Sequence, residues 1–246
     1  SQGESVKTVR RAGNNLYIEV RVPWSWLQSA VFPVKIDTTV DVQVGAGAND
    51  GYRNLSTDEL NTTSITVKQG SSIGARHGFY RWIGVSISGT VNVSYIQLYA
   101  VISSVDVWVK VTGVDEDSPA APTTKAEFDA DPLTTAGPNW IASWTVDTWM
   151  QSSSLNSVFQ ELVDSYTISN DAIMVQTRGG NGAPIGSCYS YEGDSTLAAK
   201  LHIEYTAGGI IHEGITLFAG LGLLATFGKA IYAAASQLTG NGFLAF

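Results

Sequence analysis

Catalytic chemistry has few candidate side chains in this sequence. The three histidines, His77, His202 and His212, are far apart, and no motif joins one to a serine or cysteine nucleophile and an orienting carboxylate. No histidine or cysteine spacing suits zinc. A glycosidase needs two carboxylates across a cleft, and nothing singles out such a pair. The sequence therefore predicts a protein that is not an enzyme.

One acidic cluster could bind a metal ion. Asp115, Glu116 and Asp117 supply three carboxylates in a loop bounded by glycine and proline, and Ca²⁺ prefers such hard oxygen ligands. The spacing is not that of an EF-hand, and a solvated acidic loop explains the same residues equally. Calcium binding is thus one of two interpretations of this loop, and no other cofactor is predicted.

Three tryptophans lie close together in the sequence: Trp140, Trp144 and Trp149. Flat aromatic rings can stack on sugars or on other apolar faces, so this cluster is a candidate carbohydrate-binding site. In a β-sandwich, however, tryptophans also serve as core residues or as anchors for loops. The sequence leaves both interpretations open.

Most of the elements that would hold these side chains are predicted β-strands. The clearest is 200–205, where apolar and polar residues alternate: Leu201, Ile203 and Tyr205 against Lys200, His202 and Glu204. Similar short runs are separated by glycine-rich turns: 64–68, 79–83, 91–101, 105–111, 141–146 and 172–177. This pattern predicts an all-β fold, a jelly-roll-like antiparallel β-sandwich.

One short helix is predicted, at about 152–163. Its apolar residues follow helical spacing: Leu155, Val158, Phe159, Leu162 and Val163. A serine among residues 152–154 can cap its start. The rest of 113–150, apart from the strand at 141–146, is predicted to be a long connection.

The composition restricts the classes of binding partner and the expected location of the protein. The 246 residues include 14 basic and 22 acidic side chains without a basic cluster, which argues against nucleic acid. Charged residues are 15% of the chain, against roughly 25% in typical globular proteins. Because this low-charge, Ser/Thr/Asn/Gly-rich composition is common in extracellular and virion β-proteins, we expect a virion or extracellular location. The single Cys188 is expected to be a small buried residue.

The chain divides into three parts by composition. Residues 1–37 are an N-terminal strand and lead-in segment, which we expect to continue from an upstream region. Residues 38–207 are predicted to form the β-sandwich domain, and 208–246 a Gly/Ala/Leu-rich tail. The tail repeats itself, because Phe218–Ala225 matches Leu238–Ala245 in the pattern apolar-x-Gly-x-Gly-apolar-Leu-Ala.

Three interpretations of the tail compete. A membrane helix at 215–238 would carry Lys229 in its middle and many glycines, so membrane insertion is disfavoured. A glycine-rich phosphate loop would need a surrounding βαβ unit. A β-repeat that buries its apolar face against copies of itself or other subunits suits the period best. The residues expected to mediate this assembly, into a homo-oligomer or with other subunits, are Phe218, Leu223, Leu224, Leu238, Phe243 and Leu244.

Several blocks of the sequence resemble a known family. They are 23–27 with 32–37, then 78–82 with 91–100, then 155–163 with 170–173, 190–195 and 200–205. In order and spacing they resemble the DNRLRE-type β-sandwich domain of tailed-phage structural proteins and bacterial surface proteins, and the tail resembles repeats that follow such domains in phage proteins. After Asp164 the chain departs from the family pattern, with Ser-Tyr-Thr-Ile in place of an Arg-Pro-Gly-Trp-like turn. The resemblance implies a jelly-roll-like sandwich with a structural or adhesive role, and no catalytic residues.

These observations favour a non-enzymatic structural subunit of a phage virion, in a tail or head fibre or a decoration, or of an extracellular filament. In this hypothesis the subunit assembles through its apolar C-terminal tail. The alternative is a carbohydrate-binding or adhesive module of a bacterial cell-surface protein, with cell-surface glycans as partners.

Overall fold

The computed structural model describes residues 6–12, 15–21, 37–70, 75–179 and 184–206. The chain forms two compact units, and residues 36–209 make up one of them. The other unit contains the hairpin of β1 (Val6–Ala12) and β2 (Asn15–Arg21), which pair antiparallel. The predicted assembly tail and most of the lead-in segment lie outside the described residues.

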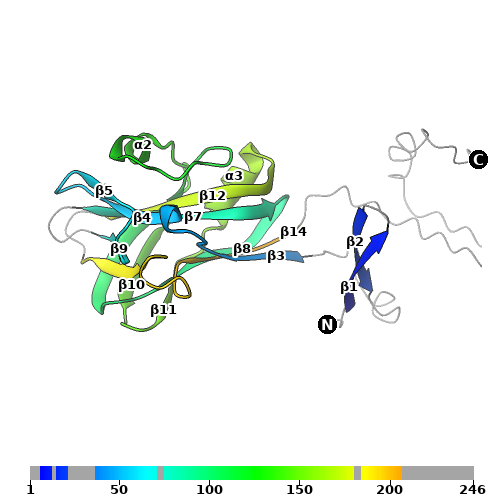
Figure 1. Ribbon diagram of the computed structural model, residues 1–246, viewed down its shortest axis with the longest axis horizontal. Helices are drawn as coiled ribbons and strands as arrows, with labels where there is room; N and C mark the ends of the chain where they lie inside the picture. The colour runs from blue at the N-terminus through cyan, green and yellow to red at the C-terminus, as the bar shows by residue number, and fades with distance from the viewer. Residues whose placement is uncertain (1–5, 13–14, 22–36, 71–74, 180–183, 207–246) are drawn as a thin grey trace, which may run out of the picture. The chain divides into compact units, whose positions relative to one another are not determined.

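The larger unit is a β-sandwich of two antiparallel sheets (Figure 1). One sheet has six strands in the order β10-β9-β12-β7-β4-β5, the other has four in the order β11-β8-β14-β3, and β6 and β13 form a separate pair. Their bounds are β3 (Asp37–Gln43), β4 (Asp50–Asn54), β5 (Glu59–Asn61), β6 (Thr66–Gln69), β7 (Arg76–Ile87), β8 (Thr90–Tyr99), β9 (Ser104–Gly113), β10 (Asn139–Trp144), β11 (Trp149–Gln151), β12 (Ile168–Gly179), β13 (Gly186–Tyr189) and β14 (Lys200–Thr206). The helices are the 3-10 turn η1 (Gly47–Asn49), α2 (Lys125–Ala130) and α3 (Asn156–Ser165).

Eight of these strands follow jelly-roll connectivity. Numbered along the chain, β3, β7, β8, β9, β10, β11, β12 and β14 are strands one to eight of the roll. Their spatial orders are then 1-8-3-6 in the four-stranded sheet and 2-7-4-5 in the six-stranded sheet, which β4 and β5 extend. This alternation between two sheets is the double Greek key of a jelly roll. The predicted all-β, jelly-roll-like sandwich is therefore confirmed.

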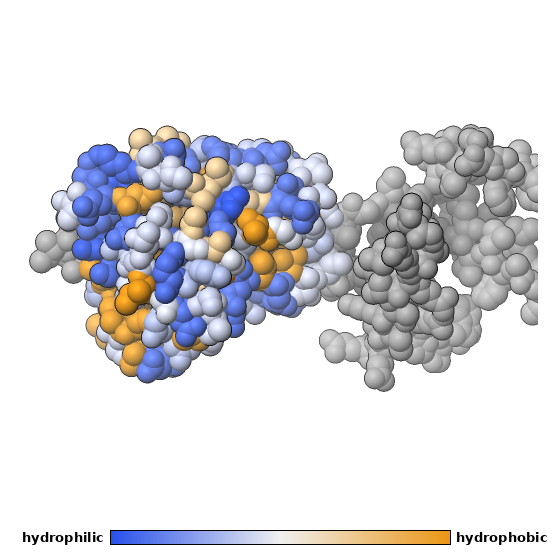
Figure 2. Space-filling view, viewed as in Figure 1, coloured by the Kyte–Doolittle hydropathy of each residue, from blue (hydrophilic) through white to orange (hydrophobic). Residues whose placement is uncertain are grey.

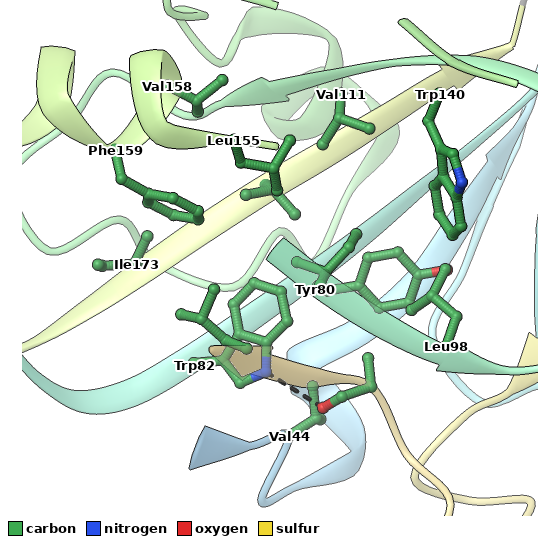
Figure 3. Close-up of a cluster of buried hydrophobic side chains, with 14 of the residues drawn as sticks. Val44, Tyr80, Trp82, Leu98, Val111, Trp140, Leu155, Val158, Phe159 and Ile173 are labelled. Carbon is green, nitrogen blue, oxygen red and sulfur yellow. Dashed lines mark hydrogen bonds between the residues drawn. The ribbon is translucent and has the colours of Figure 1, made fainter. Parts of the chain in front are cut away.

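One apolar core fills the space between the two sheets (Figure 3). Tyr80 and Trp82 enter it from β7, and the indole N–H of Trp82 donates to the carbonyl of Ala199 at 3.1 Å. From the opposite sheet, Leu201 and Ile203 of β14 are buried, whereas the residues that alternate with them are partly exposed. The two faces predicted for this strand are therefore confirmed.

Helix α3 closes the sandwich by packing on β8 and β9, one strand from each sheet. Its predicted apolar face is buried, but the helix begins at Asn156 rather than near 152, with Leu155 as an N-cap that has no side-chain hydrogen bond. Of the serines predicted as caps, Ser154 contacts the start of the helix, because its hydroxyl accepts from the N–H of Asn156 at 3.4 Å, whereas Ser152 and Ser153 have other partners. The hydroxyl of Ser152 accepts from the N–H of Ile96 at 3.1 Å, and that of Ser153 donates to the carbonyl of Asn139 at 3.1 Å.

The structure adds a second helix, α2, within the predicted long connection. A capping box starts it: the hydroxyl of Thr124 accepts from the N–H of Glu127, whose carboxylate accepts from the N–H of Thr124. Phe128 of α2 is fully buried and packs on Phe79 of β7, with ring centroids 6.0 Å apart. Within the described residues, no helix is long and apolar enough to cross a membrane.

Candidate ligand-binding face

The four-stranded sheet turns one side toward solvent, and this outer face carries the candidate site. Because side chains alternate along a strand, the residues between the buried ones point away from the core. The register aligns them in rows: His202 lies opposite both Asp41 and Tyr95, and Trp149 lies opposite Tyr99. The outer face includes Asp41, Gln43, Tyr95, Gln97, Tyr99, Trp149, Gln151, Lys200, His202 and Glu204.

His202 is held by neighbours on three sides. Its Nδ1 lies 2.7 Å from Oδ1 of Asp41, and its Nε2 lies 3.3 Å from Oε1 of Glu204. Its ring stacks on Tyr95, with centroids 4.6 Å apart and planes 19° apart. Both ring nitrogens therefore have a hydrogen-bonding partner on this face, and together with the stacking on Tyr95 these contacts hold the imidazole in place.

Three aromatic rings form a platform beside this histidine. Trp149 of β11 meets Tyr99 of β8 edge to face, with centroids 5.3 Å apart, and Tyr189 of β13 lies 6.1 Å from Tyr99. The ammonium of Lys200 lies 3.9 Å from the centroid of the Trp149 ring, a cation–π contact. We call Tyr99, Trp149, Tyr189 and Lys200 the aromatic platform. Its side chains are all partly exposed.

Amide groups flank the aromatic platform. Gln43 is already occupied, because its amide N–H groups donate to the carbonyls of Thr196 and Ala198. Gln97 and Gln151 lie opposite each other on β8 and β11, and neither side chain makes a hydrogen bond within the described part of the chain. Partly exposed rings next to free amides match the two needs of sugar recognition, which are an apolar surface and hydrogen-bonding groups.

The structure separates the three tryptophans of the predicted carbohydrate site. Trp140 and Trp144 of β10 are 4% and 3% exposed and pack on each other in the core, with ring centroids 5.6 Å apart. Figure 3 shows Trp140 among these core side chains. Their faces are therefore covered by protein. Only Trp149 reaches the surface, and its aromatic neighbours there come from strands that are distant in sequence.

The carboxylates of the acidic loop are not grouped together in the described part of the chain. Asp115 is half-buried and anchors the loop through its backbone, whose carbonyl accepts from the hydroxyl of Tyr166 at 2.9 Å. Glu116 and Asp117 are exposed. Among the residues described, no three Asp, Glu, His or Cys side chains are grouped so that they could hold a metal ion. The calcium interpretation of Asp115, Glu116 and Asp117 therefore gains no geometric support.

Two buried ionisable groups inside the sandwich have raised pKa values. Burial raises the pKa of the Cys188 thiol to about 12, and its Sγ lies 3.2 Å from the hydroxyl of Tyr80. Cys188 is thus the buried residue expected from the sequence, and a thiolate nucleophile is excluded at neutral pH. Burial also raises the pKa of Asp50 to about 7, although the N–H of Tyr191 donates to its Oδ2 and lowers the pKa in part.

The fold places the chain among the jelly-roll β-sandwich proteins. A scan against protein-family models finds no match, and a search of curated proteins finds none. The resemblance of the sequence blocks to DNRLRE-type domains therefore stays a prediction.

Proposed function

We propose that the chain is a non-enzymatic structural subunit of a virion, as part of a phage tail or head fibre or decoration, or of an extracellular filament. The observation that carries the proposal is the complete jelly roll, whose two sheets share one apolar core. Such a sandwich is a rigid unit that can be displayed and repeated, and jelly rolls build many viral capsid domains. This part of the argument is by analogy of fold.

One feature of the described residues supports a role without catalysis: the single cysteine, Cys188, is buried as a thiol. The composition and the self-repeating tail support assembly, since an apolar surface of that size needs a partner.

Electron microscopy and sedimentation velocity of the full chain, and of a chain that ends at residue 207, test the proposal. We expect the full chain to form regular assemblies and the shortened chain to lose most of them. A full chain that stays a monodisperse monomer over a wide concentration range would contradict the proposed role.

The aromatic platform favours a second candidate function, a carbohydrate-binding or adhesive module of a bacterial cell-surface protein. Trp149 and Tyr99 offer ring surface, and Gln97 and Gln151 offer free amides on the same face. Jelly-roll sandwiches also serve as lectin domains.

A glycan array with the wild-type chain tests this second function. For any glycan that binds, Trp149→Ala should weaken binding about tenfold or more, equivalent to ~1.4 kcal/mol. The matched control is Trp108→Ala, because Trp108 is also partly exposed but lies on β9 of the other sheet. Absence of binding, or equal effects of the two changes, would count against a carbohydrate site on this face.

A further inference from the structure

Strand β10 ends the six-stranded sheet with an edge that is open except at Asn139, whose carbonyl accepts from the hydroxyl of Ser153. The strand pairs only with β9, and the N–H of Val111 donates to the carbonyl of Pro138 at 3.0 Å. In an antiparallel pair, residues that bond to the neighbour alternate with residues that bond outward. Trp140 and Ala142 therefore bond to β9, and the N–H and C=O of Ile141 point to the open side. No partner for these two groups exists within the described residues.

The other edges of the two sheets are protected in ways that β10 is not. Natural sheets prevent unwanted pairing with charged residues, prolines or very short edge strands. The edges β5 and β11 have three residues each, and β3 carries Asp37 and Asp41. By contrast, β10 has six residues, none of them charged or proline. An extra residue bulges from β9 and not from β10, since Ala142 pairs with Val107 and Trp144 with Ser104.

Exposed apolar side chains gather around this edge. Eight large hydrophobic side chains are exposed in the described part of the chain, and four of them lie on β9, β10 and the loops at their ends. The two loops are joined, because the hydroxyl of Ser103 accepts from the N–H of Val146 at 3.1 Å. Figure 2 shows hydrophobic side chains over the part of the surface where Figure 1 places β10. The four are Ile102 (41%), Val105 (67%), Ile141 (63%) and Val146 (41%).

The distribution of charge leaves this edge as a place where two copies of the chain can meet. The chain carries a net charge of -8, so two copies repel each other over most of their surface. Residues 139–146 contain no charged side chain, so this repulsion is weakest there. A strand edge with unpaired backbone groups is also self-complementary when two copies meet antiparallel, because each N–H finds a C=O.

We propose that β10 is the interface for a second copy of this chain, with the two β10 strands paired antiparallel about a twofold axis. Ile141 then lies opposite Ile141 of the second copy, and each Ile141 N–H donates to the other's carbonyl. The pairing joins two six-stranded sheets into one continuous sheet. It concerns the sandwich alone, so it goes beyond the proposed assembly through the C-terminal tail.

Cysteine cross-linking in the full chain tests the pairing. Opposed residues of a hydrogen-bonded antiparallel pair have Cα atoms about 5.5 Å apart, within the range that a disulfide spans. Ile141→Cys should therefore give at least about tenfold more disulfide-linked dimer under oxidising conditions than Ile83→Cys, a control on the same sheet. Ile83 is 51% exposed, and the native Cys188 is buried. Equal cross-linking of the two variants would overturn the proposal.

Hydrogen exchange of the unmodified full chain gives a second, mutation-free test. Slower exchange in 139–146 as protein concentration rises, without a change in 59–61 of β5, is the expected result. Exchange in 139–146 that is independent of concentration overturns the pairing. These tests are independent of the assembly proposed through the C-terminal tail. Cross-linking and hydrogen exchange report on contacts at β10, whereas the chain that ends at residue 207 reports on the tail.

Discussion

Helix α2 covers the outward side chains of the six-stranded sheet over β4, β7 and β12, which we call the covered face, whereas the outward side chains of the four-stranded sheet face solvent. Phe79 and Met174 point away from the main core, yet both are buried because Phe128 of α2 lies on them with Val114. Among the described residues, no helix covers the outer face of the four-stranded sheet, which we call the open face and where His202 and Trp149 are partly exposed. Burial in this protein thus depends on what lies over a sheet as well as on the alternation of its strands.

An ion pair helps to hold α2 over the covered face. Arg53 of β4 is 4% exposed, and its guanidinium lies within 3.3 Å of the carboxylate of Asp129 in α2. The same guanidinium bonds Asp58 beyond β4 and donates to the carbonyl of Asn54 at 2.8 Å. These bonds satisfy a buried charge that would otherwise be costly. The open face has no comparable buried cation among its described residues.

The largest expected effect comes from uncovering the covered face. Phe128→Ala leaves a cavity above Phe79 and Met174, and we expect the free energy of unfolding to fall by about 3 to 5 kcal/mol. Trp149→Ala on the open face should cost about 1 kcal/mol, because that ring is only partly buried. Urea denaturation of both variants measures the difference. Equal losses would show that α2 does not stabilise its sheet.

A buried carboxylate should make stability fall as pH rises. Burial raises the pKa of Asp50 from 3.8 to about 7, so the folded state holds this proton more tightly than the unfolded state. The contribution of protonated Asp50 to the free energy of unfolding is full below about pH 4 and is lost as pH rises through 7. Asp50→Asn should remove this loss. The free energy of unfolding of the variant, relative to that of the wild type, should therefore rise by up to about 4 kcal/mol between pH 4 and pH 8.

Denaturant unfolding of wild type and Asp50→Asn across this pH range measures the effect as a difference. The difference is needed because burial lowers the pKa of His77 to about 4, which opposes the trend in the wild type. Stability curves that stay parallel from pH 4 to 8 would contradict the assignment to Asp50.

A smaller effect is expected at the start of α2. Thr124→Ala removes the hydroxyl that accepts from the N–H of Glu127, and should destabilise the protein by about 1 kcal/mol. Thr135→Ala is the control, since the exposed Thr135 hydroxyl makes no hydrogen bond in the described part of the chain. In thermal unfolding, Thr124→Ala should be less stable than Thr135→Ala, and the reverse order would argue against the cap.

The smallest expected effect is on the open face. Replacing Lys200 by Gln removes the cation above Trp149, and the contact should be worth about 0.5 kcal/mol at this partly exposed site. A double-mutant cycle with Trp149→Ala isolates the interaction from other effects of each change. A coupling energy indistinguishable from zero would remove this contact from the description of the aromatic platform.

Local signals in the sequence account for much of the fold. Alternation identifies strand β14, and helical spacing identifies the buried face of α3. A signal for α2 was also present, because Thr124 and Glu127 have the spacing of a capping box. The twofold spacing of Trp140, Ala142 and Trp144 likewise indicates that both tryptophans share one face of β10. These features depend on neighbours within a few residues, so the sequence carries them directly.

The aromatic platform could not be predicted from local patterns of this kind. Tyr99, Trp149, Tyr189 and Lys200 lie on four strands, and no local pattern connects them. They meet because β8 pairs with both β11 and β14, and because β13 bridges to Ala100 at the end of β8. Pairing between strands distant in sequence is set by the packing of the whole core.

Residue order alone was enough to predict the class of fold, the alternating strand faces, the acidic, low-charge composition and the buried state of Cys188. These follow from periodicity and composition, which act through side-chain polarity along short stretches. The three-dimensional arrangement of strands was needed to show that Trp140 and Trp144 are core residues while Trp149 is not, and that β10 is an uncharged edge strand. Both outcomes depend on which strand lies beside which, because long-range strand pairing determines what covers each side chain.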